Sequence, residues 1–414
     1  MKVVIMAGGK GTRIASVNAD VPKPMILIDG KPILEYQINA LAAQGYCEII
    51  LIIGHLGHVI RDYFEDGSKW NVQISYIEEN TPLGTAGALF YLKEQIKDDF
   101  LLLNGDIIFD VDIRRFLAYH KAQGTMATIL THPNSHPYDS GIIVADNDGR
   151  ATNWLHKEDP RLWYRNRVNA GLHMLSPRIF SFFPELQKKD LDRDILKPLI
   201  IQHELSVYDS PEYIKDMGTP DRYYSVIEDI HSGKVAAKNL ARKQKAIFLD
   251  RDGTINKYVG FLTNIDEFEL LDGVTEAIRQ INESGYLAIV ASNQPVIARG
   301  EVSPEELQEI HNKMETLLGQ KGAYLDAIFY CPHHPHKGYE GERPEYKIEC
   351  ECRKPKPGML LAAAEKYNID LTQSWMIGDS DNDIEAGQAA GCRVIKVNTN
   401  SSELSSAVKM ILEK

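Results

Sequence analysis

The chain has 414 residues, more than one ordinary hydrophobic core accommodates, so two or three domains are expected. Hydrophobic residues make up 43% of the chain and charged residues 25%, which is typical of soluble globular proteins. The net charge of −12 argues against a general nucleic-acid surface, and no apolar run approaches the ~18 residues of a membrane span.

The first predicted element is a short buried strand at residues 3–7, which runs directly into a glycine loop. An apolar stretch this short, followed at once by glycines and Lys10, does not fit an export signal. We therefore expect a cytoplasmic protein whose five cysteines are reduced thiols or metal ligands.

Further short apolar segments alternate with helical patterns along the chain. In the first half, residues 33–44 have a helical pattern, and the candidate strands are residues 49–53, 101–103 and 127–130. A second leading strand at residues 246–249 is followed by candidate strands at residues 287–291, 327–330, 375–377 and 394–397. This alternation predicts an α/β protein with two doubly wound parallel-sheet domains. We place the domains at residues 1–232 and 245–414, joined by a solvated basic linker at residues 233–244.

The loop after the first strand reads A-G-G-K-G-T-R, from Ala7 to Arg13. Glycines let the backbone approach a phosphate closely, and Lys10 and Arg13 add positive charge. The loop is neither a Walker motif nor the dinucleotide fingerprint, because no G-K-[ST] closes it and Ile14 replaces the third glycine. Taken alone, such a loop is also compatible with a purely structural turn.

Three further segments favour a nucleotide site. V-P-K-P-M places Lys23 between two prolines, where it cannot lie inside a helix. T-P-L-G-T-A-G-A, around Gly84, is a second loop of small residues that can lie flat against a base. N-G-D places Asp106 after an apolar strand, and the carboxyl end of a parallel strand is where ligands and Mg²⁺ usually bind.

Together these segments resemble the sugar-1-phosphate nucleotidyltransferases, over roughly residues 1–230. The resemblance implies a Rossmann-like fold in which a nucleoside triphosphate is held by Gly8, Gly9, Gly11, Thr12 and Arg13. It implies that Lys23 binds the phosphates, that Gly84 lies by the base, and that Asp106 and Asp216 bind Mg²⁺. It further implies sugar or phosphate contacts from Asn169, Gly171 and Lys157, although His156 replaces the glutamate that usually precedes this lysine.

The implied reaction needs no covalent enzyme intermediate. A sugar 1-phosphate oxygen attacks the α-phosphorus of the triphosphate, and pyrophosphate leaves. The protein has to position two polyanions and neutralise their charge, which is the task of cations and Mg²⁺. Arg13 and Lys23 are the candidate catalytic residues.

The second half contains F-L-D-R-D-G-T, which places Asp250 and Asp252 at the end of a predicted buried strand. A carboxylate is a usable nucleophile towards phosphorus, provided that cations cancel the repulsion of the phosphate. Ser292, Lys354 and Asp379 follow in the segments A-S-N-Q, R-K-P and I-G-D-S-D-N-D.

These four segments, in this order, resemble the haloacid dehalogenase superfamily, over about residues 245–414. The resemblance implies that Asp250 is the nucleophile and Asp252 the general acid/base. It implies that the phosphate ligands are Ser292, Asn293, Arg353 and Lys354, and that the Mg²⁺ ligands are Asp250, Asp252 and Asp379. Asp383 is expected to support the metal site rather than to bind the metal.

A zinc site is predicted from C-P-H-H at residues 331–334 and C-E-C at residues 350–352. Cys331, His333, Cys350 and Cys352 would form a Cys₃His set, the composition of a closed structural zinc site. His334 and His336 are alternatives for the histidine position. The two other cysteines, Cys47 and Cys392, lie near apolar strands and are predicted to be small buried residues.

The zinc loop narrows the resemblance to the heptose 1,7-bisphosphate and histidinol-phosphate phosphatases, although Ser380 replaces the lysine or arginine common after the metal aspartate. P-L-G-T-A-G resembles the heptose 1-phosphate guanylyltransferases. We therefore predict an enzyme that removes the 7-phosphate of heptose 1,7-bisphosphate and makes GDP-heptose with GTP, for lipopolysaccharide or another surface glycan. The expected partners are a nucleoside triphosphate, sugar phosphates and a possible second copy of the chain. The alternatives are a hexose 1-phosphate nucleotidyltransferase fused to a histidinol-phosphate-type phosphatase, and a sugar-nucleotide sensor with vestigial sites.

Overall fold

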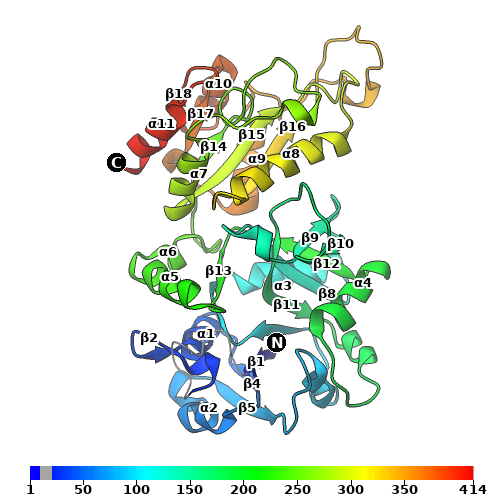
Figure 1. Cartoon of the computed structure of the whole chain (residues 1–414), viewed down its shortest axis with the longest axis vertical. Coiled ribbons are helices and arrows are strands. Elements are labelled where there is room, and N and C mark those ends of the chain that lie inside the picture. Colours follow the sequence, from blue (N-terminus) through cyan, green and yellow to red (C-terminus); the bar gives the residue numbers. More distant parts are fainter. Residues whose placement is uncertain (10–20, 414) are drawn as a thin grey trace. The chain divides into compact units, whose positions relative to one another are not determined.

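The computed structural model describes residues 1–9 and 21–413, which fold into two compact units (Figure 1). Unit 1 consists of Met1–His132, Ile143–Trp154 and Asn169–Ala236. Unit 2 consists of Pro133–Ile142, Leu155–Val168 and Ala237–Lys414.

Unit 1 is built on one large mixed sheet and two small two-stranded ones. Its strands are β1 (Val3–Met6), β2 (Leu27–Ile28), β3 (Lys31–Pro32), β4 (Glu48–Ile53), β5 (Gln73–Glu78), β6 (Phe100–Asn104), β7 (Ile107–Asp110), β8 (Ala127–His132), β9 (Ile142–Ala145), β10 (Ala151–Leu155), β11 (Val168–Leu175), β12 (Leu205–Asp209) and β13 (Tyr213–Asp216). Its helices are α1 (Ile33–Ala42), α2 (Gly57–Phe64), α3 (Ile113–Gln123), α4 (Lys197–Ile201), α5 (Pro220–His231) and α6 (Lys234–Ala237). The predicted strands and the predicted first helix are confirmed, with ends that differ by a few residues.

The large sheet has the strand order β10-β9-β11-β6-β1-β4-β5, with β8 beside β11 and β12 beside β8. Strand β1 pairs in parallel with β4 and β6, as the alternating pattern predicted. Strand β11 runs antiparallel to β6 and β9, which the apolar pattern could not reveal because it carries no information on strand direction.

Both faces of the sheet are covered, which explains why its central strands are apolar at every position. On one face, Val3 and Ile5 pack with residues of α1, α2 and α3. On the other face, Val4 and Leu102 pack with α4 and with a short helix at Gly87–Leu92. Because Met6 pairs with Asn104, the loops after β1 and β6 leave the sheet at the same edge.

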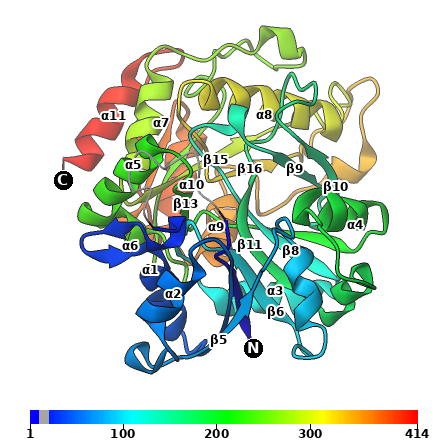
Figure 2. The ribbon, with the colours of Figure 1, turned by 60° about the horizontal axis from the view of Figure 1, so that its bottom comes forward.

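Unit 2 contains a five-stranded parallel sheet with the order β16-β15-β14-β17-β18. The strands are β14 (Lys245–Leu249), β15 (Tyr286–Asn293), β16 (Ala327–Cys331), β17 (Trp375–Gly378) and β18 (Arg393–Lys396). The helices, also seen in Figure 2, are α7 (Val274–Glu283), α8 (Pro304–Gly319), α9 (Gly358–Tyr367), α10 (Asp381–Ala389) and α11 (Glu403–Leu412). Ile247 and Leu249 face a core with α7, α8 and α11, whereas Ala246 and Phe248 face a core with α9. This is the predicted doubly wound architecture, with the carboxyl ends of β14, β15 and β17 adjacent at one edge.

The sequence predicted two contiguous domains, whereas each unit in the structure consists of three segments that are separate in the chain. Leu155–Val168 packs within unit 2, where Arg167 is buried and donates to Glu315 of α8 over 3.1 Å. The expected solvated linker is wrong for its second part, because Lys238 is buried with its Nζ 3.3 Å from Asp326 Oδ1. A count of charges along this segment could not show that one of its lysines would meet a buried carboxylate.

Candidate active sites and metal centre

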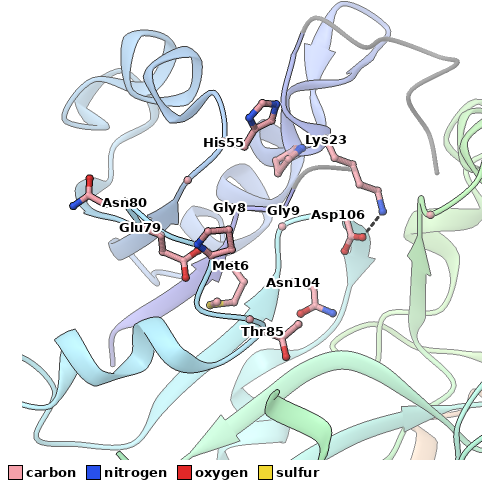
Figure 3. A pocket seen from close by; sticks show the side chains of 16 residues that line it. Met6, Gly8, Gly9, Lys23, His55, Glu79, Asn80, Thr85, Asn104 and Asp106 are labelled. Atoms are coloured by element: carbon pink, nitrogen blue, oxygen red, sulfur yellow. Dashed lines mark hydrogen bonds and ion pairs between the residues drawn. The ribbon is translucent and has the colours of Figure 1, made fainter. Parts of the chain in front are cut away.

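The first candidate site is a cavity of about 770 Å³ beyond the ends of β1 and β6 (Figure 3). Residues expected to bind a nucleotide or its metal line it, namely Gly8, Gly9, Lys23, Gly84 and Asp106. Gly11, Thr12 and Arg13, which the sequence assigns to the same site, lie outside the described residues. The two loops predicted to hold a nucleotide therefore share one cavity with the strand-end carboxylate.

Lys23 and Asp106 form an ion pair in this cavity (Figure 3). Lys23 begins a single 3₁₀ turn, Lys23–Met25, so the expectation that it lies outside any helix is wrong. Proline is tolerated in the first turn because its missing N–H would have no partner there. The turn presents the ammonium group to the carboxylate that follows β6.

Asp216 ends β13, whose antiparallel pairing with β7 brings it beside Asp106. The Met217 N–H donates to the Asp106 carbonyl oxygen over 2.9 Å, which fixes this arrangement. Burial raises the pKa of Asp216, but the Arg222 guanidinium, 2.8 Å from Oδ2, outweighs burial and holds the pKa below its usual value. Asp106 lines the cavity, and Asp216 lies beside it without lining the cavity; both are carboxylates, the hard oxygen ligands that Mg²⁺ prefers.

The predicted sugar contacts, Asn169 and Gly171, are not among the described residues that line this cavity. The Asn169 Oδ1 accepts the N–H of Gly171 over 3.1 Å, and its Nδ2 lies 3.5 Å from Asp192. Burial, followed by the charge of Asp190, raises the pKa of Asp192 to about 7. Lys157 belongs to Leu155–Val168 of unit 2 and is not among the described residues that line the cavity.

The second candidate site is centred on Asp250, the residue directly after β14. The Lys354 Nζ lies 2.6 Å from Asp250 Oδ1 and 2.5 Å from Asp383 Oδ1. Burial raises the pKa of Asp250 to about 7, against the opposing effect of Lys354. The same two carboxylates outweigh burial at Lys354 and raise the pKa of its ammonium group. The Asp250 carboxylate is thus held beside a buried cation.

Asp252 has a different environment, dominated by Arg251. Burial raises its pKa, but the Arg251 guanidinium, with Nη2 2.8 Å from Oδ2, outweighs burial and lowers the pKa below its usual value. Gln294 and Asn256 donate further hydrogen bonds to the carboxylate, of 2.9 and 3.0 Å. The two aspartates of D-R-D are therefore tuned in opposite directions.

Three carboxylates, those of Asp250, Asp379 and Asp383, each place an oxygen within 4.8 Å of the others. Gly253 has φ +88°, and a Cβ there would lie 2.3 Å from Asp379 Oδ2, so only glycine lets this carboxylate approach. The donor set fits Mg²⁺, because all three groups are hard oxygen ligands. Asp252, also predicted as a metal ligand, is outside this cluster, because its carboxylate turns to Arg251.

The predicted phosphate ligands line a cavity of about 430 Å³ together with Asp250 and Asp379. They are Ser292, Asn293, Arg353 and Lys354. Asn293 makes two hydrogen bonds of 3.0 Å with the Lys354 backbone. Its Nδ2 donates to the Lys354 carbonyl oxygen, and its Oδ1 accepts the Lys354 N–H. The other oxygen of Asp383, Oδ2, accepts a hydrogen bond of 2.7 Å from the Ser380 hydroxyl.

The predicted zinc ligands converge in the structure. Cys331, His333, Cys350 and Cys352 place their donor atoms within 4.8 Å of one another. The donor set fits Zn²⁺, because three sulfurs and one imidazole nitrogen make a four-ligand closed site. A hydrogen bond between the sulfurs of Cys352 and Cys331, 3.2 Å apart, lowers the pKa of Cys352 to about 5. His334 and His336 are outside this group of described residues.

The two remaining cysteines behave differently from each other. Cys392 is buried, as predicted, whereas Cys47 is exposed, so the prediction for Cys47 is wrong. Cys47 lies directly before β4, which begins at Glu48. An apolar strand therefore does not show whether the residue that precedes it is buried.

Several residues that shape the sites were missed from the sequence. Arg251 and Gln294 hold Asp252, and Arg222 holds Asp216. The signal for Arg251 and Gln294 was available, since both lie inside the segments already singled out, D-R-D and S-N-Q. Glu79, which lines the first cavity, carries no motif that would have identified it.

Comparison with known proteins finds a different family for each of two parts of the chain. Residues 2–233 match the family model described as nucleotidyl transferase, and residues 351–411 match the one described as HAD-hydrolase-like. The D-glycero-beta-D-manno-heptose-1,7-bisphosphate 7-phosphatase of Pasteurella multocida is 46% identical over 36% of this chain and 77% of its own length.

Two solved structures are also similar. HddC from Yersinia pseudotuberculosis complexed with GMP-PN is 28% identical, with a TM-score of 0.48 over 55% of this chain and 99% of that chain. D,D-heptose 1,7-bisphosphate phosphatase from B. bronchiseptica, complexed with magnesium and phosphate, is 33% identical, with a TM-score of 0.37 over 41% of this chain and 99% of that chain. Separately, none of the helices in the described part of the chain has the length and apolar character needed to cross a membrane.

The chain therefore belongs to the nucleotidyl transferase family through residues 2–233 and to the heptose-bisphosphate phosphatase family through its C-terminal part, and it is a bifunctional enzyme.

Proposed function

We propose that this enzyme dephosphorylates heptose 1,7-bisphosphate at C7 and couples the resulting heptose 1-phosphate to GTP, giving GDP-heptose and pyrophosphate. The observation that carries the proposal is the presence, in one chain, of a nucleotidyl transferase domain and a phosphatase domain 46% identical to a 7-phosphatase. A transferase that uses the phosphate on C1 needs a phosphatase that leaves that phosphate in place, and a 7-phosphatase meets this condition. The guanine base is proposed from the likeness of P-L-G-T-A-G to guanylyl-type loops.

In the phosphatase site, Asp250 is proposed to attack the C7 phosphorus, forming an aspartyl-phosphate as the phosphorus–oxygen bond to the sugar breaks. Lys354, Arg353 and Ser292 would bind the phosphate oxygens. Asp252 would give a proton to the sugar oxygen and then take one from the water that releases phosphate.

The charge state of Asp252 fits the second proton transfer, in which Asp252 takes a proton from the water that releases phosphate. Arg251 keeps it ionised in the free enzyme, ready to accept a proton from water. A bound phosphate dianion brings negative charge beside it, which raises its pKa and favours the protonated form needed for the first step.

Asp250 and Asp379 are proposed to hold a Mg²⁺ ion, supported by Asp383, and the ion would offset the repulsion between carboxylate and phosphate. Cys331, His333, Cys350 and Cys352 are proposed to hold a structural Zn²⁺. Arg353 Nη1 donates to the His333 carbonyl oxygen over 3.1 Å, so this centre would position the loop that carries Arg353 and Lys354. With four protein ligands it would have no open position for chemistry.

In the transferase site, Lys23 and Arg13 are proposed to bind the triphosphate. Asp106 and Asp216 would hold a Mg²⁺ ion, which would neutralise charge on the phosphates. A phosphate oxygen of the heptose 1-phosphate would form the new bond to the α-phosphorus, while the bond to pyrophosphate breaks. Asn169 and Gly171 are proposed sugar contacts.

The cytoplasm, where nucleoside triphosphates are present and thiols stay reduced, is the proposed compartment. GDP-heptose would serve the synthesis of lipopolysaccharide or another surface glycan.

A panel of GTP, UTP, CTP and dTTP with heptose and hexose 1-phosphates tests the transferase assignment by pyrophosphate release. The highest kcat/KM should belong to GTP with heptose 1-phosphate. A hexose 1-phosphate with another triphosphate as the best pair would replace this function with that of a hexose nucleotidyltransferase.

A further inference from the structure

A buried histidine of unit 2 has no role in the proposed chemistry but contacts a residue that holds Asp252. His311 lies on α8, and 2% of its surface is exposed. Its Nε2 lies 3.2 Å from Nη1 of Arg251, and its ring lies beside that of Tyr330, with the ring centroids 5.6 Å apart. Because its surroundings hold the imidazole in place, His311 offers Arg251 a fixed hydrogen-bond partner.

The direction of this hydrogen bond follows from the chemistry of the two groups. A guanidinium group donates hydrogen bonds and accepts none, so Nε2 of His311 has to be the acceptor. This requires a neutral imidazole that carries its proton on Nδ1. Burial, followed by the positive charge of Arg251, lowers the pKa of His311 to about 3, which agrees with the neutral form.

The other donors of Arg251 face the general acid/base. Its Nε lies 3.2 Å from Asp252 Oδ1, and its Nη2 lies 2.8 Å from Asp252 Oδ2. Gln294 joins the same two residues, because its Oε1 accepts from Arg251 Nη2 over 3.0 Å and its Nε2 donates to Asp252 Oδ2 over 2.9 Å. The guanidinium group is therefore held along one edge by a carboxylate and an amide, and at Nη1 by the imidazole of His311.

Burial makes the contact at Nη1 important for the position of the whole guanidinium group. Arg251 has no exposed surface, so a donor that lost its acceptor could not turn to bulk water. Without the imidazole nitrogen, Nη1 would have to find another acceptor, and the guanidinium group would shift. Asp252 would move with it, because two of its three side-chain partners are Arg251 and Gln294.

We propose that His311 acts through Arg251 as a positioning residue, which fixes the Asp252 carboxyl group for proton transfer to the leaving sugar oxygen. In that step an oxygen of Asp250 bonds to phosphorus. The phosphorus–oxygen bond to the sugar breaks, and the sugar oxygen keeps the electron pair and takes the proton of Asp252. His311 is not among the described residues that line the second cavity, so it acts at a distance from the substrate. The inference rests on the proposed phosphatase chemistry.

The test compares two phosphate esters whose leaving groups differ in their need for a proton. The sugar oxygen of heptose 1,7-bisphosphate leaves as an alkoxide unless Asp252 protonates it, whereas p-nitrophenolate is stable without a proton. Phosphate release from each ester is measured with the full chain and compared as kcat/KM. This quantity covers the steps up to cleavage of the ester, so the later role of Asp252 in the attack of water does not enter.

His311→Leu replaces the acceptor with an apolar side chain of similar size. With heptose 1,7-bisphosphate its kcat/KM should fall by ~10- to 100-fold, the effect of a small displacement of a catalytic group. With p-nitrophenyl phosphate its kcat/KM should stay close to that of the wild type. His311→Gln should restore most of the loss, because its amide oxygen can reach the position of Nε2.

Met314→Ala is the matched control for damage to α8. Met314 is buried about one turn further along the same helix and belongs to the apolar core. Its truncation should loosen the packing of α8 without removing a hydrogen bond from Arg251. The ratio of the two kcat/KM values should therefore equal that of the wild type.

Equal loss with both esters in His311→Leu would show a structural role and overturn the inference, as would an unchanged ratio. A His311→Gln variant that behaves like His311→Leu would overturn the role of the acceptor. If His311→Leu is not recovered as folded protein, His311→Asn replaces it, because its shorter amide stays polar but ends short of Arg251. The same selective loss is then expected, and the wild-type ratio would overturn the inference.

Asp252→Asn separates failure of this inference from failure of the proposed chemistry. It should show a selective loss with heptose 1,7-bisphosphate. If it does not, the assignment of Asp252 as the general acid fails together with the role of His311. A selective loss in Asp252→Asn and none in His311→Leu would overturn the role of His311 alone.

Discussion

Lys354 Nζ lies 2.6 Å from Asp250 Oδ1, although the two residues are 104 positions apart in the chain. Both side chains are buried, so each charge depends on the other for compensation. The pairing opposes the rise that burial causes in the pKa of the proposed nucleophile, and it positions a cation for the phosphate that Asp250 would attack.

Asp250→Asn should abolish phosphate release and leave nucleotidyl transfer nearly unchanged. The amide keeps the shape of the side chain but removes the nucleophilic oxygen. Phosphate and pyrophosphate release, measured on the same preparation, check this prediction. Full phosphatase activity in this variant would remove Asp250 from the mechanism.

Asp252→Asn provides a comparison within the same motif. It should slow phosphate release by ~10²- to 10⁴-fold, which is the usual effect of losing a general acid/base, instead of abolishing it. Equal loss in the two variants would contradict the separate roles.

Lys23→Ala and Asp106→Ala should each abolish pyrophosphate release and leave phosphate release intact. Lys23 is proposed to bind the triphosphate and Asp106 its metal, and both line the first cavity only. Arg13→Ala should have the same pattern. Retention of transferase activity in both Lys23→Ala and Asp106→Ala would contradict the assignment of this cavity.

The sites that the sequence predicted best are those at strand ends. Asp106 and Asp250 each follow a short apolar strand, and the carboxyl ends of adjacent parallel strands meet at one edge of a sheet. The convergence of Cys331, His333, Cys350 and Cys352 was also predictable, because two close pairs of cysteines and histidines separated by a longer loop are typical of structural zinc sites.

The features that the sequence did not predict depend on contacts between residues that are distant in the sequence. The Glu79 carboxylate lies against Gly8, where a Cβ would be 2.8 Å from Oε2, and Lys238 is buried with its Nζ 3.3 Å from Asp326 Oδ1. Neither contact leaves a pattern along the chain. The packing of Leu155–Val168 within unit 2 is of the same kind, since it depends on partners more than a hundred residues later.

Metal analysis should find about one zinc per chain, and Cys350→Ser should lose it. Structural zinc sites bind with apparent free energies of ~10–16 kcal/mol in small peptides, so the melting temperature of unit 2 should fall without the metal. Cys47→Ser is the control, since Cys47 is an exposed cysteine outside the cluster. A zinc-free preparation with an unchanged melting temperature would refute the structural role.

Acidification should destabilise unit 1 through His173, which is buried in β11. Burial lowers the pKa of His173 from 6.5 to about 4. The unfolded state therefore takes up a proton first as the pH falls below 6.5, and the folded state loses stability down to about pH 4. The difference corresponds to roughly 3 kcal/mol at most.

His173→Leu removes this titration, so its free energy of unfolding should depend less on pH between 6.5 and 4 than that of the wild type. Urea unfolding at several pH values in this window measures the difference. His58→Leu, at an exposed position of α2, should behave as the wild type does. Parallel pH profiles for wild type and His173→Leu would show that His173 does not contribute.

The two sites are proposed to act in sequence on one sugar, and the ratio of their products is a direct test of this order. The intact enzyme is given heptose 1,7-bisphosphate, GTP and Mg²⁺, and phosphate, pyrophosphate and nucleotide sugar are quantified together. We predict one phosphate and one pyrophosphate for each GDP-heptose formed, and accumulation of heptose 1-phosphate when GTP is left out. Release of the phosphate on C1, or hydrolysis of histidinol phosphate alone, would contradict the account and leave the two sites serving separate reactions.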